Sequence, residues 1–181
     1  MANATTILTG LVRFSYVNVF TPRESLDGGE PKHSIVLLIR KKDSKTLDRI
    51  KAAIAAATEE GKSKLWGGKI PKGLKSPLHD GDLEKDAEEY ENMMYISASN
   101  KRKPGIVDED LIDIIDPEEV YPGAWGRAQL RFFPYNNKSA GIGCSLENLQ
   151  KLKDDERLGA PIQKAADAFG EEAFEDDDDL Y

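Results

Sequence analysis

The sequence predicts a mainly β protein, a small closed or nearly closed barrel with one main α-helix at about residues 44–60 and a disordered acidic C-terminal tail. Two observations lead to this fold class. Five segments carry strand patterns, either many β-branched and aromatic residues, a continuous apolar middle or alternation, whereas one segment spaces its apolar residues as a helix does. With 181 residues, of which 39% are hydrophobic, the chain suits a single domain. We therefore expect one domain over residues 1–160 and a tail over 161–181.

Five strands are expected, and each has its own pattern. The first is rich in Thr, Val and Phe, the second has a continuous apolar middle, and the third alternates apolar with polar residues. The last two flank Tyr135–Lys138, whose composition suits a hairpin turn. The expected strands are 6–20, 32–41, 93–100, 124–134 and 139–147.

The predicted helix has a capping residue, an apolar face and a stop signal. Asp43 or Ser44 can cap its start, and Gly61 is a natural stop. Its apolar residues fall on one face at helical spacing: Leu47, Ile50, Ile54 and Ala57. Three further segments have weaker patterns: 61–81 is expected to be a long basic loop, 82–91 a short acidic helix, and 111–116 a short strand or turn.

Charge is divided unevenly along the chain, although the formal net charge is −8. Residues 1–80 and 121–152 are basic, with 14 and 4 basic residues against 8 and 1 acidic ones. The remaining blocks are acidic, and the last twelve residues hold seven carboxylates and no basic residue. Such asymmetry indicates an electrostatic partner, or a tail that competes for one. Because dense like charges repel, we expect the end of the chain to be disordered.

Several protein classes are excluded by composition. No apolar run approaches the roughly 20 residues of a membrane span, and the N-terminus lacks a signal pattern. The single Cys144 cannot form an internal disulfide, and one cysteine with two histidines does not make a structural zinc site. We therefore expect no metal, no cofactor, no membrane partner and a cytoplasmic location.

The segment 124–134 carries the main functional signal. Alternation sends Trp125, Arg127, Gln129, Arg131 and Phe133 to one side of the strand, and small and large apolar residues to the other. Cations for phosphates and aromatic faces for unstacked bases are what single-stranded nucleic acid requires. The structural alternative is that the aromatic rings cover the end of a core while the arginines are solvated.

Other segments add cations or aromatic rings to this interface. Arg13 and Tyr16 lie in the first strand, and Tyr95 shares the polar face of the third. Trp66 and Lys69 belong to the basic loop, which would close as a flap over the nucleic acid. A further basic patch directly follows the third strand: Lys101, Arg102 and Lys103.

The acidic segments admit other functions. The carboxylates at 108–119 could hold a divalent metal, as in a metal-dependent phage nuclease or resolvase. A third class is an acidic interaction protein whose basic strand meets the tail of a neighbouring subunit. The tail ends in an apolar tip that a docking peptide would use, after a run of carboxylates: Asp176, Asp177, Asp178, Asp179, Leu180 and Tyr181.

Nearly the whole chain resembles the Enc34-like single-stranded-DNA-binding proteins of tailed phages and prophages. The most specific parts are Pro104–Asp108, Val120–Gly123 and Gly141–Lys151, followed by Arg157–Gly159 and Ala168–Phe169. The resemblance implies an OB-fold barrel, without enzymatic activity, that coats single-stranded DNA during phage DNA replication or recombination. It also implies the plan of other replication proteins of this kind, in which an acidic tail ends in a hydrophobic tip.

Together, the residues and the resemblance predict an OB-fold protein that binds single-stranded DNA with little sequence preference. Its acidic tail would compete with DNA and, once released, recruit replication or recombination proteins. Weaker binding of duplex DNA or RNA and pairing of two subunits through an exposed barrel edge stay open. If the protein is encoded by a phage, its expected location is the cytoplasm of the host cell.

Overall fold

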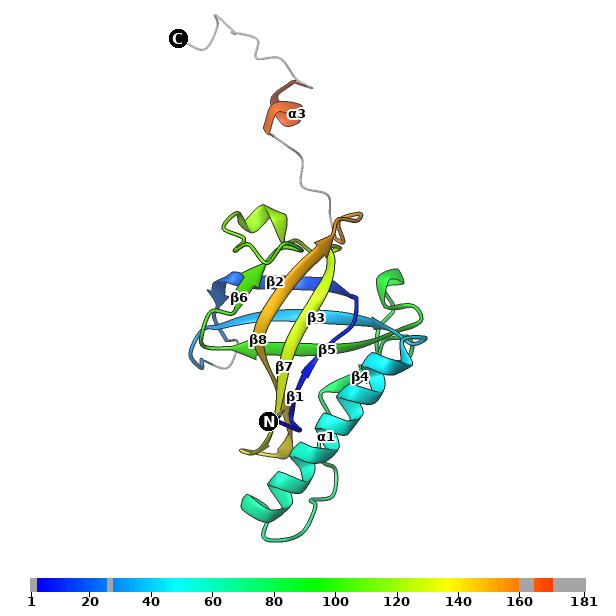
Figure 1. Cartoon of the computed structure of the whole chain (residues 1–181), viewed down its shortest axis with the longest axis vertical. Helices are drawn as coiled ribbons and strands as arrows, with labels where there is room; N and C mark the ends of the chain where they lie inside the picture. Colours follow the sequence, from blue (N-terminus) through cyan, green and yellow to red (C-terminus); the bar gives the residue numbers. More distant parts are fainter. Residues whose placement is uncertain (1–2, 26–27, 160–164, 171–181) are drawn as a thin grey trace, which may run out of the picture.

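The computed structural model describes residues 3–25, 28–159 and 165–170 and has a five-stranded barrel at its centre (Figure 1). The five barrel strands are β2 (Val12–Arg23), β3 (Lys32–Arg40), β5 (Met93–Asn100), β7 (Trp125–Asn136) and β8 (Ala140–Lys153). Three short strands extend the sheet: β1 (Thr6–Leu8), β4 (Leu78–Asp80) and β6 (Gly105–Val107). The helices are α1 (Ser44–Lys64), α2 (Gly81–Glu84) and α3 (Ala165–Gly170), with 3-10 turns at Glu88–Tyr90 and Pro117–Glu119.

The barrel closes because each of its five strands pairs with two others. β2 pairs with β3 and β3 with β5, both antiparallel, and β7 and β8 form a long hairpin. β7 also pairs with β2, and β5 meets β8 in parallel at Ser99 and Ser145. The amide of Asn100 strengthens this parallel junction by donating to the Leu146 carbonyl at 3.1 Å. This closed five-stranded arrangement confirms the predicted OB-like barrel.

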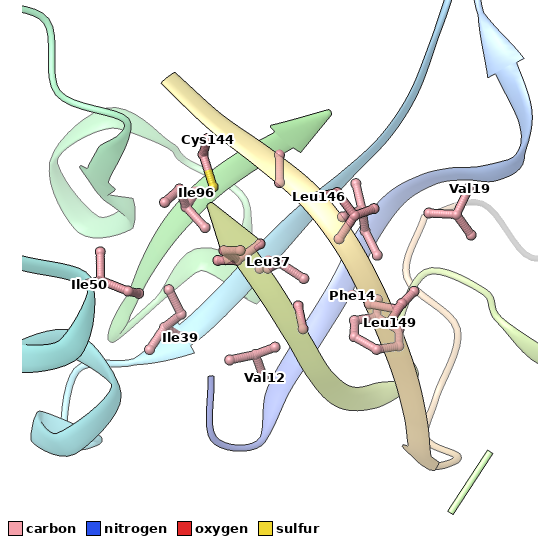
Figure 2. Packing of buried hydrophobic residues seen from close by; sticks show 14 of the residues in the cluster. Val12, Phe14, Val19, Leu37, Ile39, Ile50, Ile96, Cys144, Leu146 and Leu149 are labelled. Atoms are coloured by element: carbon pink, nitrogen blue, oxygen red, sulfur yellow. The ribbon is translucent and has the colours of Figure 1, made fainter. Parts of the chain in front are cut away.

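The barrel interior is filled by alternate residues of the five strands. Phe14, Leu37, Ile96, Leu130 and Leu146 are all fully buried, and Figure 2 shows most of them meeting between the strands. Alternation along 139–147 predicts an inward face of four side chains, of which the last three are buried and the first only partly: Ala140, Ile142, Cys144 and Leu146. Alternation along the strands therefore identified much of the core.

α1 packs across one end of the barrel against β7 and β1 (Figure 1). Asp43 caps it, its side chain accepting a hydrogen bond from the Thr46 backbone N at 3.1 Å. The predicted stop at Gly61 is wrong, because the helix continues to Lys64. Gly61 is instead buried inside the last turns, where a Cβ atom would collide with the Trp66 ring and Pro134.

Other element boundaries also differ from the sequence prediction. The segment 6–20 forms two strands, because Ile7 pairs with Leu130 on β7 before the chain turns into β2. The acidic stretch 82–91 forms only the four-residue α2 and a 3-10 turn, and 111–116, expected as a short strand or turn, makes only an isolated bridge between Asp113 and Val107. β8 continues to Lys153, because β6 and the first half of β7 both pair with its second half.

The C-terminal part of the chain is described only in part. α3 lies within the predicted tail, and all six of its residues are exposed. The predicted tip at 176–181 lies outside the described residues. Within the described part of the chain, no helix is long and apolar enough to cross a membrane.

Candidate nucleic-acid interface

A groove of about 840 Å³ lies on the outer surface of the barrel, over β5 and beside the β7–β8 hairpin. A second hollow of about 410 Å³ adjoins it toward the β2–β3 connection, with Lys32 and Ser99 lining both. The larger groove is lined by Lys32, Lys75, Ser76, Pro77, His79, Ser97, Ser99, Phe133, Tyr135, Asn137, Lys138, Ser139, Ile142, Gly143 and Cys144. In OB-fold barrels, this face and the loops beside it are where oligonucleotides bind.

Lysines from three separate segments surround the groove. Lys32 begins β3, Lys75 precedes β4, and Lys138 lies in the β7–β8 turn. All three are exposed, and none forms an ion pair with a described residue. None of the fifteen residues that line the groove is Asp or Glu. The groove therefore presents positive charge without a compensating carboxylate in its lining, as a phosphate backbone requires.

Two aromatic rings of β7 form one wall of the groove. Phe133 and Tyr135 are half-exposed, and they stand opposite Gly143 and Gly141 on β8. A Cβ atom on either glycine would collide with the facing ring. Because both partners are glycines, the rings can lie against the β8 backbone beside the groove. The Arg131 guanidinium lies 5.5 Å from the centre of the Phe133 ring, which is close enough for a cation–π contact.

A second aromatic group lies at the far side of the groove, where β4 pairs with β5. The His79 and Tyr95 rings stack with their centres 5.0 Å apart and an interplanar angle of 20°. Tyr90 meets Tyr95 edge-on, with the ring centres 5.2 Å apart. A carboxylate oxygen of Glu84 lies 3.0 Å from His79 Nδ1. Burial, with a smaller effect of Glu84, raises the pKa of Tyr95. Tyr95, which the sequence predicts as a DNA-binding residue, thus lies beside the groove through its stacking on His79.

The basic loop contributes differently from its prediction as a flap. Lys75 is fixed by the backbone, because its N–H donates to the Ala140 carbonyl at 3.2 Å and its carbonyl accepts from Ile142 N at 2.9 Å. Trp66 is half-buried against Gly61 and packs on the core, whereas Lys69 is exposed and lines none of the described hollows. Within this loop, Lys75 therefore lines the groove, whereas Trp66 packs against the hydrophobic core.

Trp125 and Arg13 do not lie where the sequence placed them. Trp125 is only 5% exposed, its indole N–H donates to Asp155 at 2.8 Å, and the Arg40 guanidinium lies 4.3 Å from its ring centre. Arg13 donates to the backbone carbonyls of Gly123 at 3.1 Å and Glu156 at 2.8 Å. Both side chains hold the segment after β8 onto the barrel, so the predicted contact with DNA does not fit this structure.

The remaining β7 arginines lie on its outer face, as predicted, but not in the groove. Arg131 forms an ion pair with Glu147 at 3.3 Å and shares this carboxylate with Arg102, at 3.5 Å. Arg127 is exposed and lines a separate hollow together with Leu8. Trp125, Arg127 and Phe133 therefore do not form one continuous binding face.

The three residues of the basic patch after β5 contact three different partners. Lys101 pairs with Glu30 at 3.0 Å, Arg102 with Glu147, and the Lys103 ammonium lies 5.3 Å from the Phe20 ring centre. A single phosphate track along the three residues is thus not formed. Tyr16 is 61% exposed, at a bulge of β2 where its φ is 44°, and it lies outside the described hollows.

Neither metal ligands nor a reactive thiol are found in the described part of the chain. It contains no group of three or more His, Cys, Asp or Glu side chains that could hold a metal ion, so the 108–119 carboxylates do not form such a group. Burial raises the pKa of the Cys144 thiol, which is only 6% exposed. This cysteine therefore behaves as a small packed side chain at the base of the groove.

Three comparisons with known proteins agree with this architecture. A family model described as the ssDNA-binding protein of Enterobacter phage Enc34 matches residues 5–180. The structure of the single-stranded DNA-binding protein from bacteriophage Enc34 in complex with ssDNA has a TM-score of 0.76 and 30% identity, covering 86% of this chain and 90% of that chain. The putative protein p50 of Acyrthosiphon pisum secondary endosymbiont phage 1 is 26% identical over 93% of this chain and 95% of its own length.

A more distant structure shares the fold alone. Gp2.5, a single-stranded DNA binding protein encoded by bacteriophage T7, has a TM-score of 0.60 at 16% identity, covering 88% of this chain and 97% of that one. The family match, by contrast, extends over almost the entire sequence, including the strands and the connection that line the groove. The chain therefore belongs to the Enc34 ssDNA-binding protein family.

Proposed function

We propose that the protein binds single-stranded DNA in this groove with little sequence preference. The observation that carries the proposal is the lining itself, which combines two half-exposed aromatic rings with three lysines that form no ion pair to a described residue, and which includes no carboxylate. Lys32, Lys75 and Lys138 would contact phosphates, and Phe133 and Tyr135 would stack on bases. Every base has an aromatic face and every nucleotide a phosphate, so such contacts do not select a sequence.

The same chemistry supports a role in coating DNA rather than in cutting it. Lysines and aromatic rings supply affinity for phosphates and bases, which is what coating a single strand requires. We therefore propose that the protein protects single strands during phage DNA replication or recombination. Duplex DNA and duplex RNA share the phosphate backbone and are expected to bind more weakly, because paired bases are not free to stack.

The acidic tail would regulate this binding. Its last twelve residues carry seven carboxylates and no basic residue, so they can neutralise the same lysines that contact phosphates. Of the 22 residues after Gly159, six form α3 and the other 16 can span about 55 Å when extended, which gives the carboxylates a long reach over the barrel. DNA would displace the tail, and the released Leu180–Tyr181 tip would recruit replication or recombination proteins.

Fluorescence anisotropy with a labelled oligo-dT strand tests the groove. Because each stacked base is worth about 1–3 kcal/mol, Phe133→Ala and Tyr135→Ala should each weaken binding by about 5- to 150-fold. Leu83→Ala is the control, because this large apolar side chain is 83% exposed on α2 and lies outside the groove. Equal affinities of all three variants and the wild-type protein would refute the groove as the DNA site.

Deletion of residues 171–181 tests the tail. The truncated protein should bind oligo-dT more tightly at low salt, and the difference should shrink at high salt as the competing charges are screened. An unchanged affinity at both salt concentrations would refute the competition while leaving the groove untouched.

A further inference from the structure

The molecule carries two exposed apolar patches whose surrounding charges have opposite signs. One is the connection 108–119 between β6 and β7, here called the acidic end. The other is the segment 62–72 at the C-terminal end of α1, here called the basic end. Figure 1 shows them at opposite ends of the barrel, with the acidic end beside β6 and the basic end where α1 finishes.

The acidic end presents large apolar side chains on an ordered loop. Leu111, Ile112 and Ile115 are 73%, 62% and 87% exposed. The Asp108 carboxylate accepts from the backbone N of Asp110 at 2.9 Å and of Ile112 at 3.0 Å, which fixes the loop. Residues 108–119 include seven carboxylates and no basic residue, and no described residue forms an ion pair with them. Three exposed apolar chains on one fixed loop are typical of an interaction surface.

The basic end has the same organisation with the opposite charge. Leu65 and Ile70 are 44% and 49% exposed. Four lysines surround them, and the sequence has no carboxylate between Gly61 and Leu78. Those lysines are Lys62, Lys64, Lys69 and Lys72. Only Lys64 forms an ion pair with a described residue, an exposed one to Glu60 at 3.4 Å. The remaining positive charge is available to a partner.

We propose that the acidic end of one copy docks on the basic end of the next, so that copies bound to one DNA strand associate head to tail. Apolar side chains would meet at the centre, surrounded by carboxylates on one side and lysines on the other. Since the two surfaces differ and lie at opposite ends, the contact is heterologous and generates a row of copies rather than a closed pair. The inference rests on the proposed function, because DNA provides the line along which copies gather.

The consequence is cooperative filling of a long single strand. A bound copy offers a free end to the next, so neighbouring positions fill before distant ones. Nucleic acid and the acidic tail are the competing occupants of the basic end, since the lysines there would also attract phosphates and carboxylates. The acidic end distinguishes a neighbouring copy from both, because its carboxylates repel DNA and the tail but attract the basic end.

Charge reversal at each end, in the full-length protein, tests the contact. Titration of long poly-dT measures the cooperativity factor, and a short oligo-dT that holds one copy measures intrinsic affinity. Glu109→Lys/Asp113→Lys and Lys69→Glu/Lys72→Glu should each lower the cooperativity factor at least about tenfold, about 1.4 kcal/mol per contact. A protein with all four substitutions should recover cooperativity, because complementarity returns with the signs exchanged.

A matched control separates the contact from net charge. Lys45→Glu/Lys51→Glu changes the charge as the basic-end variant does, on exposed positions of α1 away from both ends, and should keep its cooperativity. Unchanged cooperativity in the acidic-end variant, or no recovery in the fourfold variant, overturns the proposal. Wild-type protein that binds the short strand but fills poly-dT without cooperativity overturns the contact alone. Failure to bind the short strand overturns the proposed function as well.

Discussion

Removal of the three groove lysines should change the salt dependence of DNA binding by a calculable amount. Lys32, Lys75 and Lys138 are exposed, come from three segments and have no ion-pair partner among the described residues. Each phosphate contact to a single strand contributes about 0.7 to the slope of log K against log salt. The variant Lys32→Ala/Lys75→Ala/Lys138→Ala should therefore have a slope that is shallower by about 2.

The difference is large enough to measure by anisotropy with labelled oligo-dT. Between about 50 and 200 mM salt, a slope difference of about 2 makes wild-type protein lose about 20-fold more affinity than the variant. The matched control is Lys42→Ala/Lys45→Ala/Lys51→Ala, which removes the same charge from exposed positions at and before α1. The control should retain the wild-type slope.

Two results would refute this reasoning. A variant with the wild-type slope would show that the groove lysines do not neutralise phosphates. An equal loss of slope in the control would show that the total charge of the protein, and not the groove, determines its affinity for DNA. Circular dichroism of each variant distinguishes either result from unfolding.

Three more predictions follow from single contacts. Gly143→Ala should displace the Phe133 ring, which lowers the free energy of unfolding in urea by about 1–3 kcal/mol and weakens oligo-dT binding. Unchanged binding would show that this ring does not contact DNA. Trp125→Phe deletes the hydrogen bond to Asp155 and should lower the free energy of unfolding by about 1 kcal/mol, with oligo-dT affinity unchanged. The Trp125 hydrogen bond holds the pKa of Asp155 below its usual value, so its stabilisation is present above about pH 4 and lost as the pH falls further. Acid titration of tryptophan fluorescence should show this loss, and Asp155→Ala should abolish it.

The barrel could be predicted because its determinants are local. Strand alternation identified the interior of 139–147, and helical spacing identified the buried face of α1. The end of α1 was harder to predict, because a glycine such as Gly61 generally favours the end of a helix. Its place inside the helix depends on Trp66 and Pro134, and Pro134 is far away in the sequence. No local pattern contains that contact.

The binding face was harder to predict for the same reason. Trp125 and Phe133 share one face of β7 by alternation, yet one is buried and the other half-exposed. The difference arises from Asp155, thirty residues after Trp125, which returns to cover the indole. Lys75 was included only as part of the predicted basic loop and Tyr135 only as part of a turn, so neither was assigned to the proposed groove. The glycines at 141 and 143, which alternate opposite two aromatic residues, were a usable signal.

Contacts between the barrel and the segment directly after β8 determine where a truncation of the tail can begin. Asp154 pairs with Lys151 at 2.6 Å and accepts from the Tyr121 hydroxyl at 2.9 Å, while Asp155 accepts from Trp125. These carboxylates already have partners on the barrel, so they add little to competition with DNA. A truncation from residue 154 would expose Trp125 and lower stability, and its affinity could not be compared with that of the whole protein. A truncation after Gly170 removes seven carboxylates and leaves these contacts intact, so any gain in DNA affinity can be assigned to the tail.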